Sequence, residues 1–189
     1  DNTTADFNTG LGYNALTTNT LGNRSVAIGQ GTLADQNYTT ATTAYNTAVG
    51  DTAGNAITTG QNNTLVGGLC GDSMTTGSNN VGMGVHAIGG GTVTGDDNTA
   101  MGFNAGSAIT SGSNNTLIGH DAGLSGSPGG ACTTGTNRIA LGDENVDNAH
   151  IQVSFVAASD ERDKTDFVDL DLGLDFVKAL EPVTYYWDC

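Results

Sequence analysis

The sequence predicts an all-β fold in which short parallel strands stack as the coils of a β-solenoid, and two observations carry the prediction. The first is composition: 29 of the 189 residues are glycine, aromatic residues make up 6% and hydrophobic residues 37%. So few large apolar side chains would leave a conventional globular core thin. The second is a pattern ending in an apolar residue and glycine, which recurs at a short, nearly fixed interval and indicates a solenoid.

The repeat unit is usually 17 residues long, and we predict about eight coils over residues 1–145. Its glycines are separated by 17, 21, 17, 17, 18, 17 and 23 residues. A small residue follows three positions after six of them: Ala15, Ala53, Cys70, Ala87, Ala105 and Ala122. Asparagine stands four residues before the glycine in six of the eight segments, which are Asn8–Gly12, Ser25–Gly29, Asn46–Gly50, Asn63–Gly67, Asn80–Gly84, Asn98–Gly102, Asn115–Gly119 and Arg138–Gly142.

Each unit supplies one short strand and one corner. The corner sequence Gly-Ser-Asn-Asn at 77–80 and 112–115 tolerates positive φ, and asparagines at equivalent corners can bond to neighbouring backbone or stack as a ladder. The small residue suits a narrow interior. One coil is too small to be stable alone, so the stacked coils bury a continuous core. The strand positions hold apolar residues such as Val49, Leu65, Val66, Met83, Met101, Leu117 and Ile118.

The two long intervals locate insertions. The 21-residue interval adds four residues near 35–45, and the 23-residue interval adds six near 125–135. Insertions in a solenoid emerge as loops on one face, often the binding face. No aromatic cluster marks either loop, which favours surface loops without a binding function. Tyr38 and Tyr45 of the first loop are the candidate contact residues.

The charge balance argues against two classes of partner. Five basic and 20 acidic residues give a net charge of −15. Nucleic-acid phosphates and anionic membrane surfaces both attract basic proteins, so we expect neither nucleic-acid binding nor membrane association. No apolar run approaches the length that a membrane-spanning helix needs, so we expect no membrane insertion. The acidity is better suited to keeping an exposed protein soluble.

Cysteine and histidine give no sign of a metal centre. Cys70, Cys132 and Cys189 are odd in number and scattered, which fits neither a disulfide framework nor a metal site. Cys70 takes the small-residue position of its unit and should be buried, whereas Cys132 lies in the second insertion, where an exposed thiol would be more reactive. The histidines at 86, 120 and 150 do not fall in register. Without a phosphate loop, nucleophile elbow or paired-carboxylate motif, we predict no metal site and no cofactor.

The composition changes near residue 158, which divides the chain into a repeat region (1–145), a junction strand (146–158) and a C-terminal segment (159–189). Within the last 40 residues, the alternation at 150–156 predicts a strand. A helix capped by Asp171 should run to about Leu180, because four apolar residues fall on one face and a proline follows. Residues 183–187 predict a further strand.

The segment Asn23-Arg24-Ser25-Val26-Ala27-Ile28-Gly29 resembles the Asn-Ser-Val-Ala-Ile-Gly repeat in the heads of trimeric autotransporter adhesins of the Yersinia adhesin type. The resemblance covers roughly residues 8–145 by motif. It implies a left-handed parallel β-roll that forms a homotrimer. The 17-residue unit is slightly longer than the adhesin repeat.

The pattern Ser159-Asp160-x-Arg162-x-Lys164-Thr165, followed after the predicted helix by Leu180-x-Pro182-Val183-x-Tyr185, resembles the start of the intramolecular chaperone domain of phage tail spikes and fibres, the endosialidase type. That resemblance implies trimer assembly and self-cleavage before Ser159, with Ser159 as the nucleophile and Lys164 as its base. In the alternative reading, Ser159 caps a turn and Lys164 is a surface charge. The family domain is longer than this segment, so we expect the chain to be a processed product or part of a longer protein.

Together the resemblances imply a structural, non-enzymatic part of a trimeric phage fibre, located on the virion outside the cell. It would serve as a rigid stalk or host-attachment head, with a host surface receptor such as a glycan and other virion proteins as partners. One alternative is the head of a bacterial trimeric surface adhesin. A second is an ice- or polysaccharide-binding solenoid that uses the pairs Thr58-Thr59, Thr75-Thr76 and Thr110-Ser111.

Overall fold

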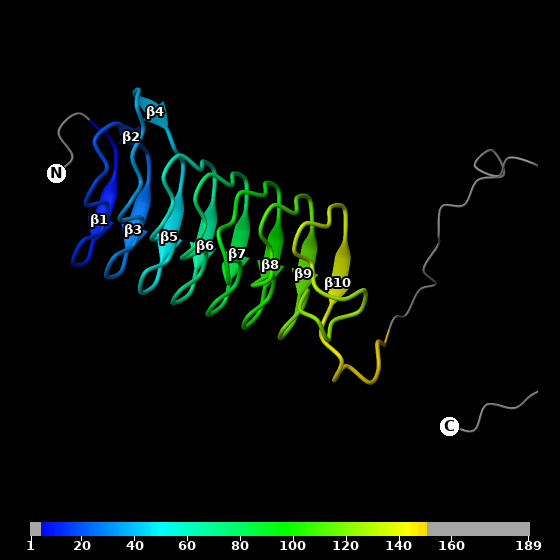
Figure 1. Cartoon of the computed structure of the whole chain (residues 1–189). Coiled ribbons are helices and arrows are strands. Elements are labelled where there is room, and N and C mark those ends of the chain that lie inside the picture. The colour runs from blue at the N-terminus through cyan, green and yellow to red at the C-terminus, as the bar shows by residue number, and fades with distance from the viewer. Residues whose placement is uncertain (1–4, 151–189) are drawn as a thin grey trace, which may run out of the picture. The chain divides into compact units, whose positions relative to one another are not determined.

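The computed structural model describes residues 5–150, and these form the row of stacked coils shown in Figure 1. Contacts divide the chain into two units, Asp1–Ala149 and His150–Cys189, and the solenoid belongs to the first. The described residues form strands and turns without any helix, so the all-β solenoid class is confirmed, and no helix among them could cross a membrane. The predicted strand-helix-strand segment after residue 150 lies outside the described residues.

One parallel sheet runs along the solenoid, and each coil contributes a three-residue strand to it (Figure 1). Every strand pairs with the equivalent three positions of the next coil, so the register does not shift along the sheet. These strands coincide with the repeat segments of the sequence. In sheet order they are β1 (Thr9–Leu11), β3 (Val26–Ile28), β5 (Thr47–Val49), β6 (Thr64–Val66), β7 (Val81–Met83), β8 (Thr99–Met101), β9 (Thr116–Ile118) and β10 (Ile139–Leu141).

The core is a narrow column inside the coils. The middle residue of a strand points inward, because side chains alternate between the two faces of a strand, and Ala48, Leu65 and Leu117 are fully buried there. The predicted small-residue position is also interior: Ala53, Cys70, Ala87, Ala105 and Ala122 are fully buried, while Ala15 in the first coil is partly buried. A third interior position holds Ile57, Met74, Val93, Ile109 and Cys132.

Glycine ends each strand because two requirements meet at that position. The glycines at 12, 29, 50, 67, 84, 102 and 119 have φ between +116° and +145°, which other residues rarely adopt. Consecutive coils also approach there through their backbones. A Cβ atom on Gly67 would overlap the carbonyl oxygen of Gly84 in the next coil. The repeat glycine is therefore needed both for the turn and for the close stacking of coils.

A ladder of buried asparagines joins the coils. The Oδ1 atom of Asn63 accepts a hydrogen bond from the backbone N–H of Asn80 at 2.9 Å, and its Nδ2 donates to the Gly77 carbonyl oxygen at 2.9 Å. The same two bonds recur at Asn46, Asn80, Asn98 and Asn115. The predicted ladder is thus confirmed, and within residues 5–150 no buried side-chain N or O atom is without a hydrogen-bond partner.

The first insertion folds back onto the coils instead of projecting freely. Its strand β4 (Thr42–Thr43) pairs in parallel with β2 (Gly22–Asn23) to form a small second sheet. Tyr38 turns inward, donates its hydroxyl to the Gly60 carbonyl oxygen at 2.7 Å and is 6% exposed. This burial raises the pKa of Tyr38 to about 12. The insertion therefore extends the core at this end of the asparagine ladder.

The second insertion is also anchored, and it corrects one expectation. Cys132 is 1% exposed, so its thiol is not the accessible group that its place in a loop suggested. Its backbone N–H donates to the Gly123 carbonyl oxygen at 2.8 Å. Cys132 thereby takes the interior position that Ile109 and Met74 occupy in other coils. Ser127 adds a hydrogen bond from Oγ to the Gly142 carbonyl oxygen at 2.9 Å.

Replacing one ladder asparagine should destabilise the whole described unit. In Asn80→Ala the Gly95 carbonyl oxygen and the Asn98 backbone N–H each lose a partner in a buried site. Unsatisfied buried groups cost about 1–3 kcal/mol each, so the free energy of unfolding should fall by about 2–6 kcal/mol in chemical denaturation.

The matched control is Asn79→Gly. Asn79 is adjacent and exposed to solvent, and glycine accepts its φ of 60°. This variant should change the free energy of unfolding by less than about 1 kcal/mol. Equal destabilisation by the two substitutions would contradict the role given to the buried ladder.

Alkaline pH should destabilise the solenoid partly through Cys70. Burial raises the pKa of the Cys70 thiol from 9.0 to about 12, so the folded state holds the proton more tightly than the unfolded state does. The resulting stabilisation is complete below pH 9 and is lost as the pH rises towards 12. The free energy of unfolding should therefore fall more steeply between pH 8 and 10.5 in the wild type than in Cys70→Ala.

Alanine is the usual residue at this position, and the Tyr38 titration is common to both proteins. The difference between the two pH slopes therefore isolates Cys70. Parallel slopes would show that the thiol does not titrate differently in the folded and unfolded states.

Candidate interaction surface

The strands also build an outward-facing row of aliphatic side chains. Because the register is constant, the third residue of every strand lies beside the third residue of the next strand. All eight are aliphatic, and together they form what we call the aliphatic row: Leu11, Ile28, Val49, Val66, Met83, Met101, Ile118 and Leu141. Leu11, Met83, Met101, Ile118 and Leu141 are exposed, with 36–66% of their surface accessible, and the other three are half-buried.

Two further rows flank the aliphatic row. The first strand positions hold only β-branched residues, which are Thr9, Val26, Thr47, Thr64, Val81, Thr99, Thr116 and Ile139. The positions directly after the repeat glycines form a mixed row, in which Tyr13, Val85 and Phe103 are exposed by 76%, 45% and 51%. Neither strand row contains a charged residue, although the whole chain has a net charge of −15.

The size of this face is set by the strand geometry. Seven inter-strand spacings make it about 34 Å long, and the five residues from the β-branched row to the mixed row make it about 13 Å wide. Its area of about 400 Å² lies within the range of the largest surface patch on a typical monomeric protein, and such patches are often functional. It is smaller than the roughly 800 Å² that each partner gives to a standard interface.

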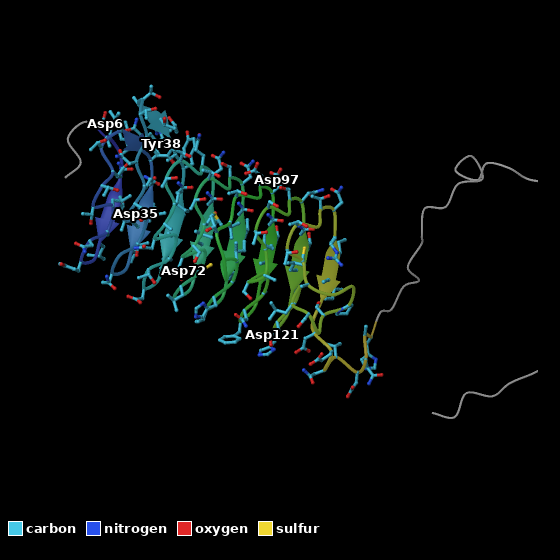
Figure 2. The ribbon with its side chains drawn as sticks, in the orientation of Figure 1. Asp6, Asp35, Tyr38, Asp72, Asp97 and Asp121 are labelled. Atoms are coloured by element: carbon cyan, nitrogen blue, oxygen red, sulfur yellow. The ribbon has the colours of Figure 1, made fainter. Side chains whose placement is uncertain are left out.

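The predicted contact residues of the first insertion do not belong to this face. Tyr38 is buried and hydrogen-bonded, so it is not a surface contact residue, and Figure 2 shows it at the end of the solenoid that carries β2 and β4. The candidate contact role of Tyr38 is not supported, because the insertion packs back onto the coil and buries the side chain. Tyr45 is 55% exposed and precedes the ladder residue Asn46, with a φ of 50°. A contact role for Tyr45 stays a prediction.

The first threonine of each predicted pair does not present a free hydroxyl. The Oγ1 atoms of Thr58, Thr75 and Thr110 donate to carbonyl oxygens of the next coil, at 3.2, 3.3 and 3.2 Å. These hydroxyls therefore help to join the coils. At these three residues the arrangement favours turn chemistry over the ice- or polysaccharide-binding alternative.

A comparison with known protein families finds a similarity in the C-terminal segment. Residues 159–188 match the family described as the chaperone of endosialidase. This segment includes the predicted dyad Ser159 and Lys164, which lies outside the residues that the structure describes. No curated protein and no solved structure matches the chain. The resemblance of the repeats to adhesin heads stays a prediction.

Proposed function

We propose that this chain is a structural component of a phage tail fibre that forms a homotrimer on the virion, with the solenoid as a rigid stalk or host-attachment head. The observation that carries the proposal is the uncharged aliphatic row along a solenoid whose chain continues into a segment of the endosialidase chaperone type. The solenoid fits a fibre because identical coils add length without changing cross-section.

A second copy of the chain is the occupant that best suits the aliphatic row. The protein is strongly acidic, so copies repel one another over most of their surfaces. Along the two strand rows this repulsion is least, because neither row carries a charge. Burying the exposed parts of the aliphatic side chains stabilises association by roughly 25 cal/mol per Å². The area of this face is small for an interface between two chains. In a trimer each copy contacts two others, and all three faces are buried together.

The remaining partners follow from the fibre proposal. A fibre exposed on a virion meets a host surface receptor such as a glycan and joins other virion proteins. The head of a bacterial trimeric surface adhesin is the alternative, because the same coils and the same row would serve it. The chaperone-type segment favours the phage fibre.

Light scattering on the whole chain tests the association, and Met101→Asp is the decisive variant. Met101 is 36% exposed in the middle of the aliphatic row. The wild type should have the mass of about three chains, whereas an aspartate in the row should shift the protein to monomers because its charge must be desolvated on association. Circular dichroism should show the same β structure in both.

Thr59→Asp is the control, since it adds the same charge at an exposed corner away from the row. It should leave the mass of the assembly unchanged. A monomeric wild type, or equal dissociation by both aspartates, would overturn the proposed role of the aliphatic row.

We propose in addition that the chain has no enzymatic turnover, because the fibre role asks for none. The resemblance to the chaperone family leaves one chemical event, cleavage between Ala158 and Ser159. We expect the purified chain to keep its intact mass of 19.0 kDa on prolonged incubation, as checked by mass spectrometry. A fragment that begins at Ser159 in the wild type, and is absent from Ser159→Ala, would instead show that the dyad with Lys164 is active.

A further inference from the structure

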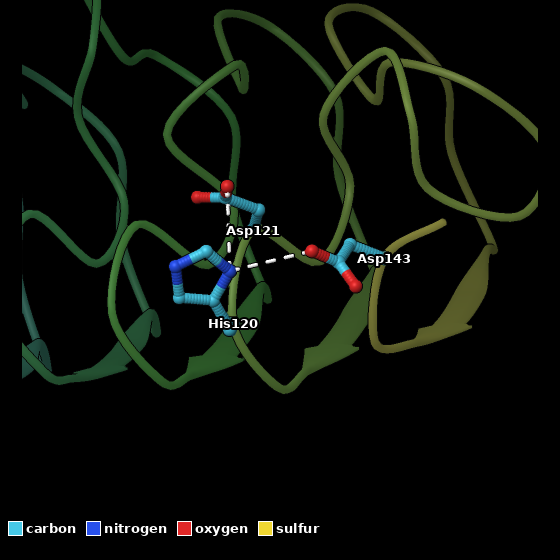
Figure 3. A group of neighbouring side chains, drawn as sticks. All are labelled: His120, Asp121 and Asp143. Atoms are coloured by element: carbon cyan, nitrogen blue, oxygen red, sulfur yellow. Dashed lines mark hydrogen bonds and ion pairs between the residues drawn. The ribbon is translucent and has the colours of Figure 1, made fainter. Parts of the chain in front are cut away.

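The mixed row brings a histidine and two carboxylates together at the last coils of the solenoid (Figure 3). His120 directly follows Gly119, and Asp143 directly follows Gly142, so the two residues take the same position in consecutive coils. Asp121 follows His120. Earlier coils place residues such as Val85 and Phe103 in this row, so the cluster is particular to this end of the described solenoid.

The distances match the spacing of metal ligands. His120 Nδ1 lies 3.3 Å from an Oδ2 atom of Asp121 and 3.3 Å from Oδ2 of Asp143. One ligand atom from each of the three residues lies within 4.8 Å of the other two. Zinc bonds of about 2.0–2.2 Å in tetrahedral geometry put neighbouring ligand atoms about 3.3–3.5 Å apart. The two distances from His120 therefore match this spacing, and the two aspartate oxygens lie within 4.8 Å of each other.

Each of the three side chains is also positioned by a neighbour outside the cluster. The Phe103 ring stacks on the His120 ring, with 5.5 Å between centroids and 16° between planes. Asn104 Nδ2 donates to Asp121 Oδ1 at 3.0 Å. This bond leaves the other oxygen of Asp121 directed at the imidazole. Supporting contacts of this kind orient the ligands of metal sites in proteins.

Asp143 is held in place by hydrogen bonds from Asn145. The side chain and backbone N–H of Asn145 donate to its two carboxylate oxygens at 2.9 and 3.0 Å. These two hydrogen bonds fix the orientation of the carboxylate, so that its Oδ2 atom lies beside the His120 imidazole.

An open pocket beside the cluster provides room for an ion and its remaining ligands. It has a volume of about 170 Å³ and is lined by His120, Asp121 and Asp143, and also by Leu124, Ser125, Gly126, Ser127, Glu144 and Asn145. Water occupies about 30 Å³ per molecule in the liquid, so the pocket can hold several waters. The side chain of Glu144 lies against Gly126 at this pocket and offers a further carboxylate.

We propose that His120, Asp121 and Asp143 form a zinc-type divalent metal site, with water or Glu144 completing the coordination. The imidazole nitrogen favours zinc and similar transition metals over magnesium and calcium, which prefer ligand sets made only of oxygen. Because the ligands come from two consecutive coils, a bound ion ties the last described coil to the one before it. The ion would thus stabilise the end of the solenoid that carries the second insertion.

Titration of Zn²⁺ into the whole chain by isothermal calorimetry tests the site, with His120→Asn and Asp143→Asn as the variants. Each removes one ligand at nearly constant size and should weaken the binding of Zn²⁺ at least tenfold. In thermal denaturation Zn²⁺ should raise the melting temperature of the wild type and have little effect on either variant. Mg²⁺ should produce no comparable heat.

His86→Asn is the matched control, since His86 is a histidine outside the cluster and asparagine accepts its φ of 56°. It should bind Zn²⁺ as the wild type does. Circular dichroism on each variant separates loss of a ligand from loss of the fold. The proposal is overturned if folded His120→Asn and Asp143→Asn bind Zn²⁺ as tightly as His86→Asn, or if the wild type binds none.

Discussion

The bonding of one coil to the next through a single buried asparagine is the interaction on which the rest of this solenoid depends. The Asn63 side chain accepts a hydrogen bond from the backbone N–H of Asn80 and donates one to the carbonyl oxygen of Gly77, and both partners belong to the next coil. The equivalent asparagines make the same two bonds. A coil of about 17 residues buries too little apolar surface to be stable alone. The ladder provides hydrogen-bond partners for the backbone N–H and C=O groups that are buried in this narrow core. Small alanine side chains can then fill the rest of the interior.

The ladder also fixes the register, and the register creates the outer surface. A shift by one residue would turn each strand over and exchange its inner and outer faces. Because no such shift occurs between β1 and β10, one aliphatic residue per repeat becomes a continuous row. A chain with only 37% hydrophobic residues can in this way present both a buried core and an apolar face. The same repetition keeps charged residues out of the two strand rows.

The insertions show where a regular solenoid gains individual features. The first brings Tyr38 into the start of the asparagine ladder, where the ring is buried beside Gly22 and Asn46. The second returns to the interior at Cys132 and lines the pocket beside His120 and Asp143. Both loops are held by hydrogen bonds to neighbouring coils. Added residues near the two ends of the repeat region have therefore become part of the fold.

The sequence by itself determined the class of fold, the strand positions and the ladder, because glycine, asparagine and small residues recur at intervals that only stacked coils satisfy. It also placed Cys70 in the interior. It did not determine the paths of the insertions, because the burial of Tyr38 and Cys132 depends on contacts with coils distant in the chain. The cluster of His120 with Asp143 was likewise hidden by a separation of 23 residues. Only the stacking of the last coils, with the inserted loop between them, placed these two side chains next to each other.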